Sequence, residues 1–143
     1  MLFFTRCLLR GMRTHDLRAG YPSCRLVSES SRRLSVRAGT VLRDPSQTFI
    51  LPTIVLVEIT YLYTKGRIDV DTAFVQQRLV AASNCVLYPL DEQVVMQIPT
   101  GLNIHDAIIV ATALVYRDIL HESVAVITKN GEITHSGLIE TVW

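Results

Sequence analysis

The sequence contains no hydrophobic run long enough to cross a membrane, because Glu58 and residues 116–118 interrupt its longest apolar stretches. A spanning helix needs roughly 20 apolar residues. The chain is also poor in cysteine. It has an odd number of cysteines, Cys7, Cys24 and Cys85, and their spacing matches neither Cys-x-x-Cys nor a Cys/His metal site. We therefore expect free thiols, a reducing cytoplasmic location and no membrane partner.

Several common catalytic motifs are missing as well. The chain has no Gly-x-Ser-x-Gly, no P-loop, no Gly-x-Gly-x-x-Gly and no His-Glu-x-x-His sequence, so none of the chemistries built on those motifs is indicated. What is present is a chain of 143 residues, of which 49% are hydrophobic. This length and composition predict one folded domain with a substantial core.

Charge is distributed unevenly along the chain. Residues 1–43 hold nine arginines, no lysine and two acids, a net charge of +7, whereas residues 44–143 hold five basic residues and eleven acids, a net charge of −6. We therefore divide the chain into a basic N-terminal segment, 1–33, and a domain, 34–143. The Arg-rich, Ser-rich composition of the segment is typical of an organellar transit peptide, of a nucleic-acid-binding arm or of a misread gene start, and these alternatives stay open.

From residue 34 onward, helical and strand patterns alternate. Helices are expected at 35–44, 53–65, 69–83, 91–98 and 104–117, and strands at 48–52, 85–90, 123–128 and 138–143, the last as an edge strand. Thr53 is expected to cap the second helix, a loop is expected around Asn103, and a turn is expected at 129–133. The strand at 123–128 is β-branched and does not alternate, which is typical of strands buried on both faces of a parallel sheet. The pattern predicts an α/β fold, a three-layer α/β/α sandwich with a mainly parallel sheet.

Two carboxylates lie in apolar surroundings. Asp106 opens the helix 104–117, which is apolar on every side and therefore expected to be buried. By itself this acid could simply stabilise the positive end of the helix dipole, by about 0.3–1 kcal/mol. Glu58 lies in mid-helix with apolar neighbours one turn away on either side, where an isolated charge costs several kcal/mol. It either points outward, pairs with an arginine, or serves as a metal ligand or general base.

A third candidate group follows the strand at 123–128, where Thr128, Lys129 and Asn130 come in succession. In open parallel sheets, ligands bind beyond the carboxyl ends of the strands, although an ordinary Asn-Gly turn explains the same residues. If this strand end and the two acidic helices share one cleft, the carboxylates would bind Mg²⁺ or Mn²⁺ between them. Such an ion positions a water for attack on a phosphate.

Taken in order, several motifs from residue 34 to residue 143 resemble those of PIN-domain proteins, in particular the VapC-type toxin ribonucleases of bacterial toxin–antitoxin pairs. The matching pieces are "RLSVRAGTVLRDPSQTFILPTIVLVEITYLYTKGRI", "YPLDEQVV", "NIHDAIIVATAL", "VAVITKNGEI" and "TVW". The resemblance implies an Mg²⁺- or Mn²⁺-dependent endoribonuclease that hydrolyses RNA phosphodiesters with a metal-activated water. It also implies an antitoxin partner and a homodimer, for which helices 53–65 and 72–82 would supply the apolar surfaces.

The resemblance assigns roles to individual residues. Glu58 and Asp106 correspond to two metal-binding acids of the family, and Asn130 stands at the place of a further acid, where its amide keeps a carbonyl ligand but loses the charge. Thr128 and Lys129 would contact the substrate.

The start of the family pattern is not matched. PIN domains begin with a strand that ends in Asp-Thr-His, but the nearest text here, "MRTHDL", has Arg13 in place of that acid. Asp16 is the local substitute and the third candidate metal ligand. Because no clear apolar strand precedes this text, we expect the first, central strand to be absent or scrambled, through a misplaced start or a frameshift.

Two alternatives to an active ribonuclease follow from these departures. The first is a catalytically impaired PIN-fold module that binds RNA or an antitoxin-like protein without cleavage. The second is an unrelated α/β domain in which the carboxylates are structural.

Overall fold

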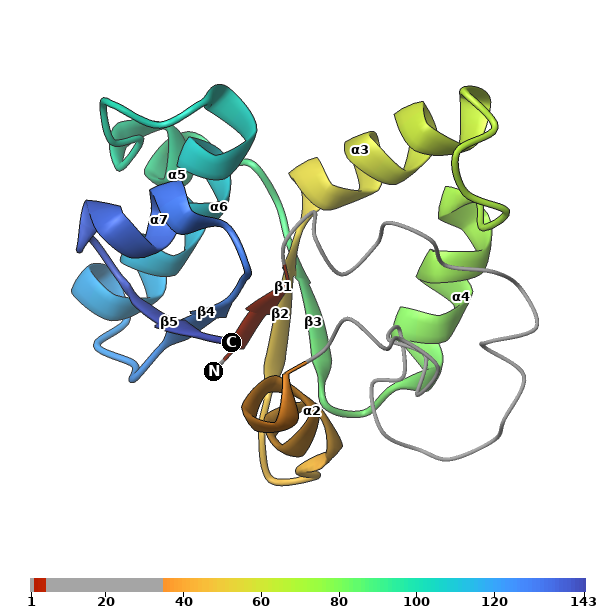
Figure 1. Cartoon of the computed structure of the whole chain (residues 1–143), viewed down its shortest axis with the longest axis horizontal. Helices are drawn as coiled ribbons and strands as arrows, with labels where there is room; N and C mark the ends of the chain where they lie inside the picture. The colour runs from red at the N-terminus through yellow and green to blue at the C-terminus, as the bar shows by residue number, and fades with distance from the viewer. Residues whose placement is uncertain (1, 5–34) are drawn as a thin grey trace.

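The computed structural model describes residues 2–4 and 35–143, and these form a mixed α/β fold around a five-stranded sheet (Figure 1). The strands are β1 (Leu2–Phe4), β2 (Phe49–Pro52), β3 (Cys85–Tyr88), β4 (Ala125–Ile127) and β5 (Glu140–Val142). Their order is β3-β2-β1-β4-β5 and every neighbouring pair is parallel. The predicted parallel α/β arrangement and the predicted strand at the C-terminal edge are confirmed.

The described helices are α2 (Val36–Arg43), α3 (Thr53–Thr64), α4 (Thr72–Ala81), α5 (Glu92–Met96), α6 (Ile104–Leu114), the π-helical turn η2 (Val115–Ile119) and α7 (Gly131–Ser136). Five of them, α2, α4, α5, α6 and α7, begin after a residue whose side chain caps them. Ser35 caps α2 by accepting from the Ala38 N–H at 3.1 Å, and Asp91 caps α5 in the same way. Such caps satisfy N–H groups that have no partner inside the helix, which is why these starts agree with the predictions.

Strand β1 is a correction to the sequence analysis. Leu2–Phe4 forms the centre of the sheet, where Phe3 pairs with Ile50 of β2 and with Val126 of β4. The expectation that the central strand is absent was therefore wrong. Three residues carry no detectable period, and the strand is held by partners far along the chain rather than by local signals.

Three smaller expectations also need correction. The residues read as a turn at 129–133 instead lead into α7, with Asn130 as its cap. Thr53 is the first residue of α3 rather than its cap, and its hydroxyl accepts from the Leu90 N–H at 3.0 Å. Cys85 is disulfide-bonded, so the expectation of free thiols was wrong for this cysteine. Spacing along the chain does not reveal which cysteines a fold brings together.

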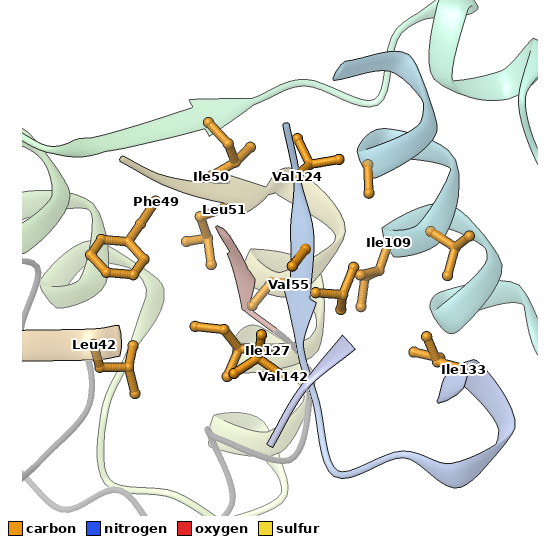
Figure 2. Close-up of a cluster of buried hydrophobic side chains, with 14 of the residues drawn as sticks. Leu42, Phe49, Ile50, Leu51, Val55, Ile109, Val124, Ile127, Ile133 and Val142 are labelled. Carbon is orange, nitrogen blue, oxygen red and sulfur yellow. The ribbon is translucent and has the colours of Figure 1, made fainter. Parts of the chain in front are cut away.

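The core joins the sheet to the helices around it. Figure 2 shows Phe49 and Ile50 of β2, Ile109 of α6 and Ile127 of β4 within one apolar cluster, and each of these side chains is at most 1% exposed. Every residue of α6 from 106 to 114 is buried, which confirms the prediction that this helix is enclosed on all sides. Among the described helices, none is both long and apolar enough to cross a bilayer.

Helices pack on different parts of the sheet. Helix α6 contacts β2 and β4, α4 contacts β3, and α7 contacts β5. In Figure 1, α3 and α4 lie on the right of the view and α5, α6 and α7 on the left, with β1, β2 and β3 between them. Helix α3 also contacts α6, so the two helices that carry the candidate acids are neighbours.

Candidate functional site

The order of the strands marks one place in the sheet. From β1 the chain passes to β2 on one side, whereas from β4 it passes to β5 on the other side. The carboxyl ends of β1 and β4 therefore flank the point where the connections diverge, and ligands of open parallel sheets bind in the crevice at such a point. Strand β4 ends at Ile127, so Thr128, Lys129 and Asn130 follow directly at this location.

Asp106 is tied to this strand end. It is the third residue of α6 and only 4% exposed. Its Oδ2 accepts a hydrogen bond from Asn130 Nδ2 at 2.7 Å and a second one from Asn103 Nδ2. Its backbone N–H donates to Asn103 Oδ1 at 3.2 Å. The start of α6 and the end of β4 are thus joined through a single carboxylate oxygen.

Asn130 uses the rest of its polar groups locally. Its Oδ1 accepts from the Glu132 N–H at 2.9 Å and so caps α7, while its backbone N–H donates to Thr128 Oγ1 at 2.9 Å. The carbonyl that we expected to keep a ligand role is therefore already bonded to a backbone amide. Asn130 acts here as a hydrogen-bond donor to Asp106.

Thr128 and Lys129 differ in accessibility. Thr128 is 1% exposed, its hydroxyl holds the backbone of Asn130, and its N–H donates to Val142 O at 3.1 Å. A side chain enclosed in this way supports the loop, so the predicted contact of Thr128 with a substrate does not fit the geometry. Lys129 is exposed and is free to approach a ligand at this edge of the sheet.

Glu58 lies in the middle of α3 and is 6% exposed, so it does not point outward. It has an interaction partner within the chain, as a buried carboxylate requires. The structure joins Asp106, Asn130 and Thr128 by hydrogen bonds. Glu58 lies on α3, which packs against α6. Asp16, the third candidate metal ligand, and Arg13, which stands in place of the expected acid, lie outside the described part of the chain.

The second oxygen of Asp106 is the feature most relevant to a metal ion. Oδ1 accepts no hydrogen bond from any residue that the structure describes. In residues 2–4 and 35–143, the one fully buried side-chain oxygen or nitrogen without a hydrogen-bond partner is Asn84 Oδ1. Asp106 Oδ1 is also without a partner but does not belong to this class, so it is not completely buried. Asp106, only 4% exposed as a residue, thus has one carboxylate oxygen with two donors and one without a donor among the described residues.

This donor set fits a hard divalent cation. Within the described residues there is no group of three or more His, Cys, Asp or Glu side chains that could hold a metal. Mg²⁺ does not require one, because it keeps several waters and takes one or two carboxylates together with substrate phosphates. Asp106 and Glu58 are the described carboxylates that are buried and could serve in this way.

Asn103 is the site residue that sequence reasoning missed. It was read only as part of a loop, yet it caps α6 and bonds to Asp106 through both atoms of its amide. The signal was present, because an Asn directly before an apolar helical run is a common N-cap.

Comparisons with models of known protein families, with curated proteins and with solved structures found no match. The resemblance to PIN-domain ribonucleases therefore stays a prediction from the motifs of the sequence. Function has to be inferred from the residues and their geometry.

Proposed function

We propose that the protein is an Mg²⁺- or Mn²⁺-dependent endoribonuclease of the PIN type, the toxin of a toxin–antitoxin pair, with the helices and sheet arranged as a three-layer α/β/α sandwich. The observation that carries the proposal is Asp106. It is buried at the point where the connections of a parallel sheet diverge, and one of its oxygens accepts no hydrogen bond from the described residues. Two donors compensate the burial of its Oδ2, and a cation at Oδ1 would balance the negative charge.

Each residue has a defined task in this proposal. Asp106, together with Glu58 on the adjacent helix, would hold the cation, which supplies charge neutralisation and an activated water. Asn103 and Asn130 hold the Asp106 carboxylate in place. Lys129, exposed beside Asn130, attracts the RNA phosphate by its charge.

Apolar side chains on two helices support protein partners. Val57, Tyr61 and Tyr63 of α3 are 59%, 51% and 47% exposed, and Val80 of α4 is 89% exposed. Surfaces of this kind often mark protein interfaces. We assign them to a homodimer contact and to an antitoxin.

The second candidate function is a PIN-fold module that binds RNA or an antitoxin-like protein without cutting. The specific observation in its favour is Asn130, whose side-chain amide donates one hydrogen bond to Asp106 and accepts one from the Glu132 N–H inside the protein. A site that has an amide at this place contributes one negative charge fewer to cation binding.

The test combines metal binding with cleavage. Mn²⁺ is titrated into the full-length protein while thermal unfolding is followed, and cleavage of a single-stranded RNA is measured with and without Mn²⁺. For a nuclease we expect an increase in Tm equivalent to about 2.7 kcal/mol at 100 times the Kd. We also expect metal-dependent cleavage, and both effects should be lost in Asp106→Asn and in Glu58→Gln.

Glu92→Gln is the matched control, because Glu92 is an exposed acid in the first turn of another helix. It should behave like the unmodified protein in both measurements. Retained metal-dependent cleavage in Asp106→Asn would refute the assignment. RNA binding without cleavage or a metal effect on Tm would favour the binding module.

A further inference from the structure

Two side-chain amides converge on one oxygen of Asp106. Asn103 lies just before α6 and Asn130 lies just before α7, and both donate from Nδ2 to Asp106 Oδ2. We propose that these two residues are positioning residues that form a clamp, defined as the Asn103, Asp106 and Asn130 side chains. The clamp fixes the carboxylate so that Oδ1 alone is presented to a cation. The role toward a cation rests on the proposed function, whereas the clamp itself does not.

The orientation of each amide is determined by its neighbours. Asn130 Oδ1 accepts from the Glu132 N–H while its Nδ2 faces the Asp106 carboxylate. A flipped amide would turn an oxygen toward the carboxylate and an NH₂ toward an N–H donor, so both bonds would be lost. Asn103 is constrained in the same way, because its Oδ1 accepts from the backbone N–H of Asp106.

The clamp leaves the two oxygens of Asp106 unequal. Oδ2 has two donors, which occupy its favourable hydrogen-bonding directions. Oδ1 has no partner among the described residues and is not sealed. A cation that reaches this buried acid therefore meets one oxygen of fixed direction, and binding does not have to order a rotating carboxylate.

An acid at position 130 would change this arrangement. A carboxylate caps a helix as well as an amide does, so α7 would keep its start. However, an oxygen would then replace the donor that lies 2.7 Å from Asp106 Oδ2, and two like charges would face each other unless a cation lay between them. Asn130 thus removes the need for a metal to hold the end of β4 against α6.

The first experiment measures the clamp without metal. Asn130→Ser, Asn130→Asp, Asp106→Asn and the double variant Asn130→Asp/Asp106→Asn are unfolded by heat in EDTA. Both changes at 130 keep a good cap, so we expect Tm to fall by roughly 2–6 °C in Asn130→Ser and by roughly 5–12 °C in Asn130→Asp. In the double variant the donor at 130 and the acceptor at 106 exchange places, while Asn103 loses its acceptor. We therefore expect the decrease in Tm of the double variant to be smaller than the sum of the two single decreases. Additive losses in the double variant would overturn the clamp.

The second experiment tests positioning by a measurement other than cleavage. Mn²⁺ affinity is measured by calorimetry for the unmodified protein, Asn103→Ser and Asn130→Ser, both of which keep a capping hydroxyl. We expect affinity to fall roughly 10–100-fold in each serine variant, as for other groups that orient a metal ligand. Unchanged affinity would overturn the positioning role. If the unmodified protein binds no Mn²⁺ but the decrease in Tm of the double variant in EDTA is smaller than the sum of the single decreases, the clamp is supported and the metal-dependent nuclease is refuted.

Discussion

Truncating Ile109 to alanine tests whether the burial of α6 holds the molecule together. Ile109 is 1% exposed and lies in the main apolar cluster with Phe49, Ile50 and Ile127 (Figure 2). The change removes all of the side chain beyond Cβ from a site without access to water. Loss of burial and the cavity left behind together cost about 2–5 kcal/mol, which is a large part of the stability of a typical domain.

The measurement is urea unfolding followed by circular dichroism and by the fluorescence of Trp143, the one tryptophan of the chain. Trp143 packs against the same cluster, so its emission reports on the core directly. The midpoint should fall with little change in the dependence on urea, because the surface exposed by unfolding stays nearly the same. In a thermal scan the corresponding decrease is roughly 6–15 °C.

Ile104→Ala is the matched control. Ile104 begins the same helix but is 58% exposed, so the same truncation should change the free energy of unfolding by no more than about 0.5 kcal/mol. The difference between the two variants isolates burial from any effect of the residue type. Equal losses in the two variants, or a loss below about 1 kcal/mol at Ile109, would refute the enclosed position of α6.

Two further predictions concern a helix cap and a pair of tyrosines. Asp71 caps α4 by accepting from the Phe74 N–H at 2.8 Å, so Asp71→Ala should cost about 1 kcal/mol in urea unfolding, whereas Asp69→Ala, at an exposed acid two residues earlier, should cost much less. Burial is the main cause that raises the pKa of Tyr88 and of Tyr116 above about 10. Because folding disfavours both phenolates, the free energy of unfolding should fall as pH rises past about 10. Ultraviolet absorbance should show that both tyrosines ionise at a higher pH in the folded protein than in the unfolded protein. Ionisation of both at the same pH in the two states would contradict this.

Local signals account for most of the elements that were predicted correctly. Ser35 and Asp91 are caps that satisfy backbone groups of their own helices, so they can be read without knowledge of the rest of the fold. The apolar composition of α6 likewise predicts its burial, because no face of that helix is suited to water. For Glu58 the neighbours one turn away left an outward or a buried position open, and the structure shows that it is buried.

Strand β1 could not be predicted for the opposite reason. Its three residues gain their hydrogen bonds from β2 and β4, which lie more than forty positions further along the chain, with Leu2 opposite Phe49. A central strand of a parallel sheet is specified by such distant partners more than by its own composition. The Arg-rich sequence that follows also obscures the strand, because any window of residues long enough to show a pattern includes those charges as well.

The candidate site combines both kinds of information. That Asp106 is buried and that Asn130 follows a strand are local facts, and both were predicted. The bond between them joins residues 24 positions apart, and the packing of α6 against β4 brings the amide to the carboxylate. The cap of α7 then fixes the amide so that its nitrogen faces Asp106. An amide in place of an acid is therefore not simply a lost ligand. Where it caps a helix with its oxygen, its nitrogen necessarily faces elsewhere, and here it turns a position that would repel Asp106 into one that holds it.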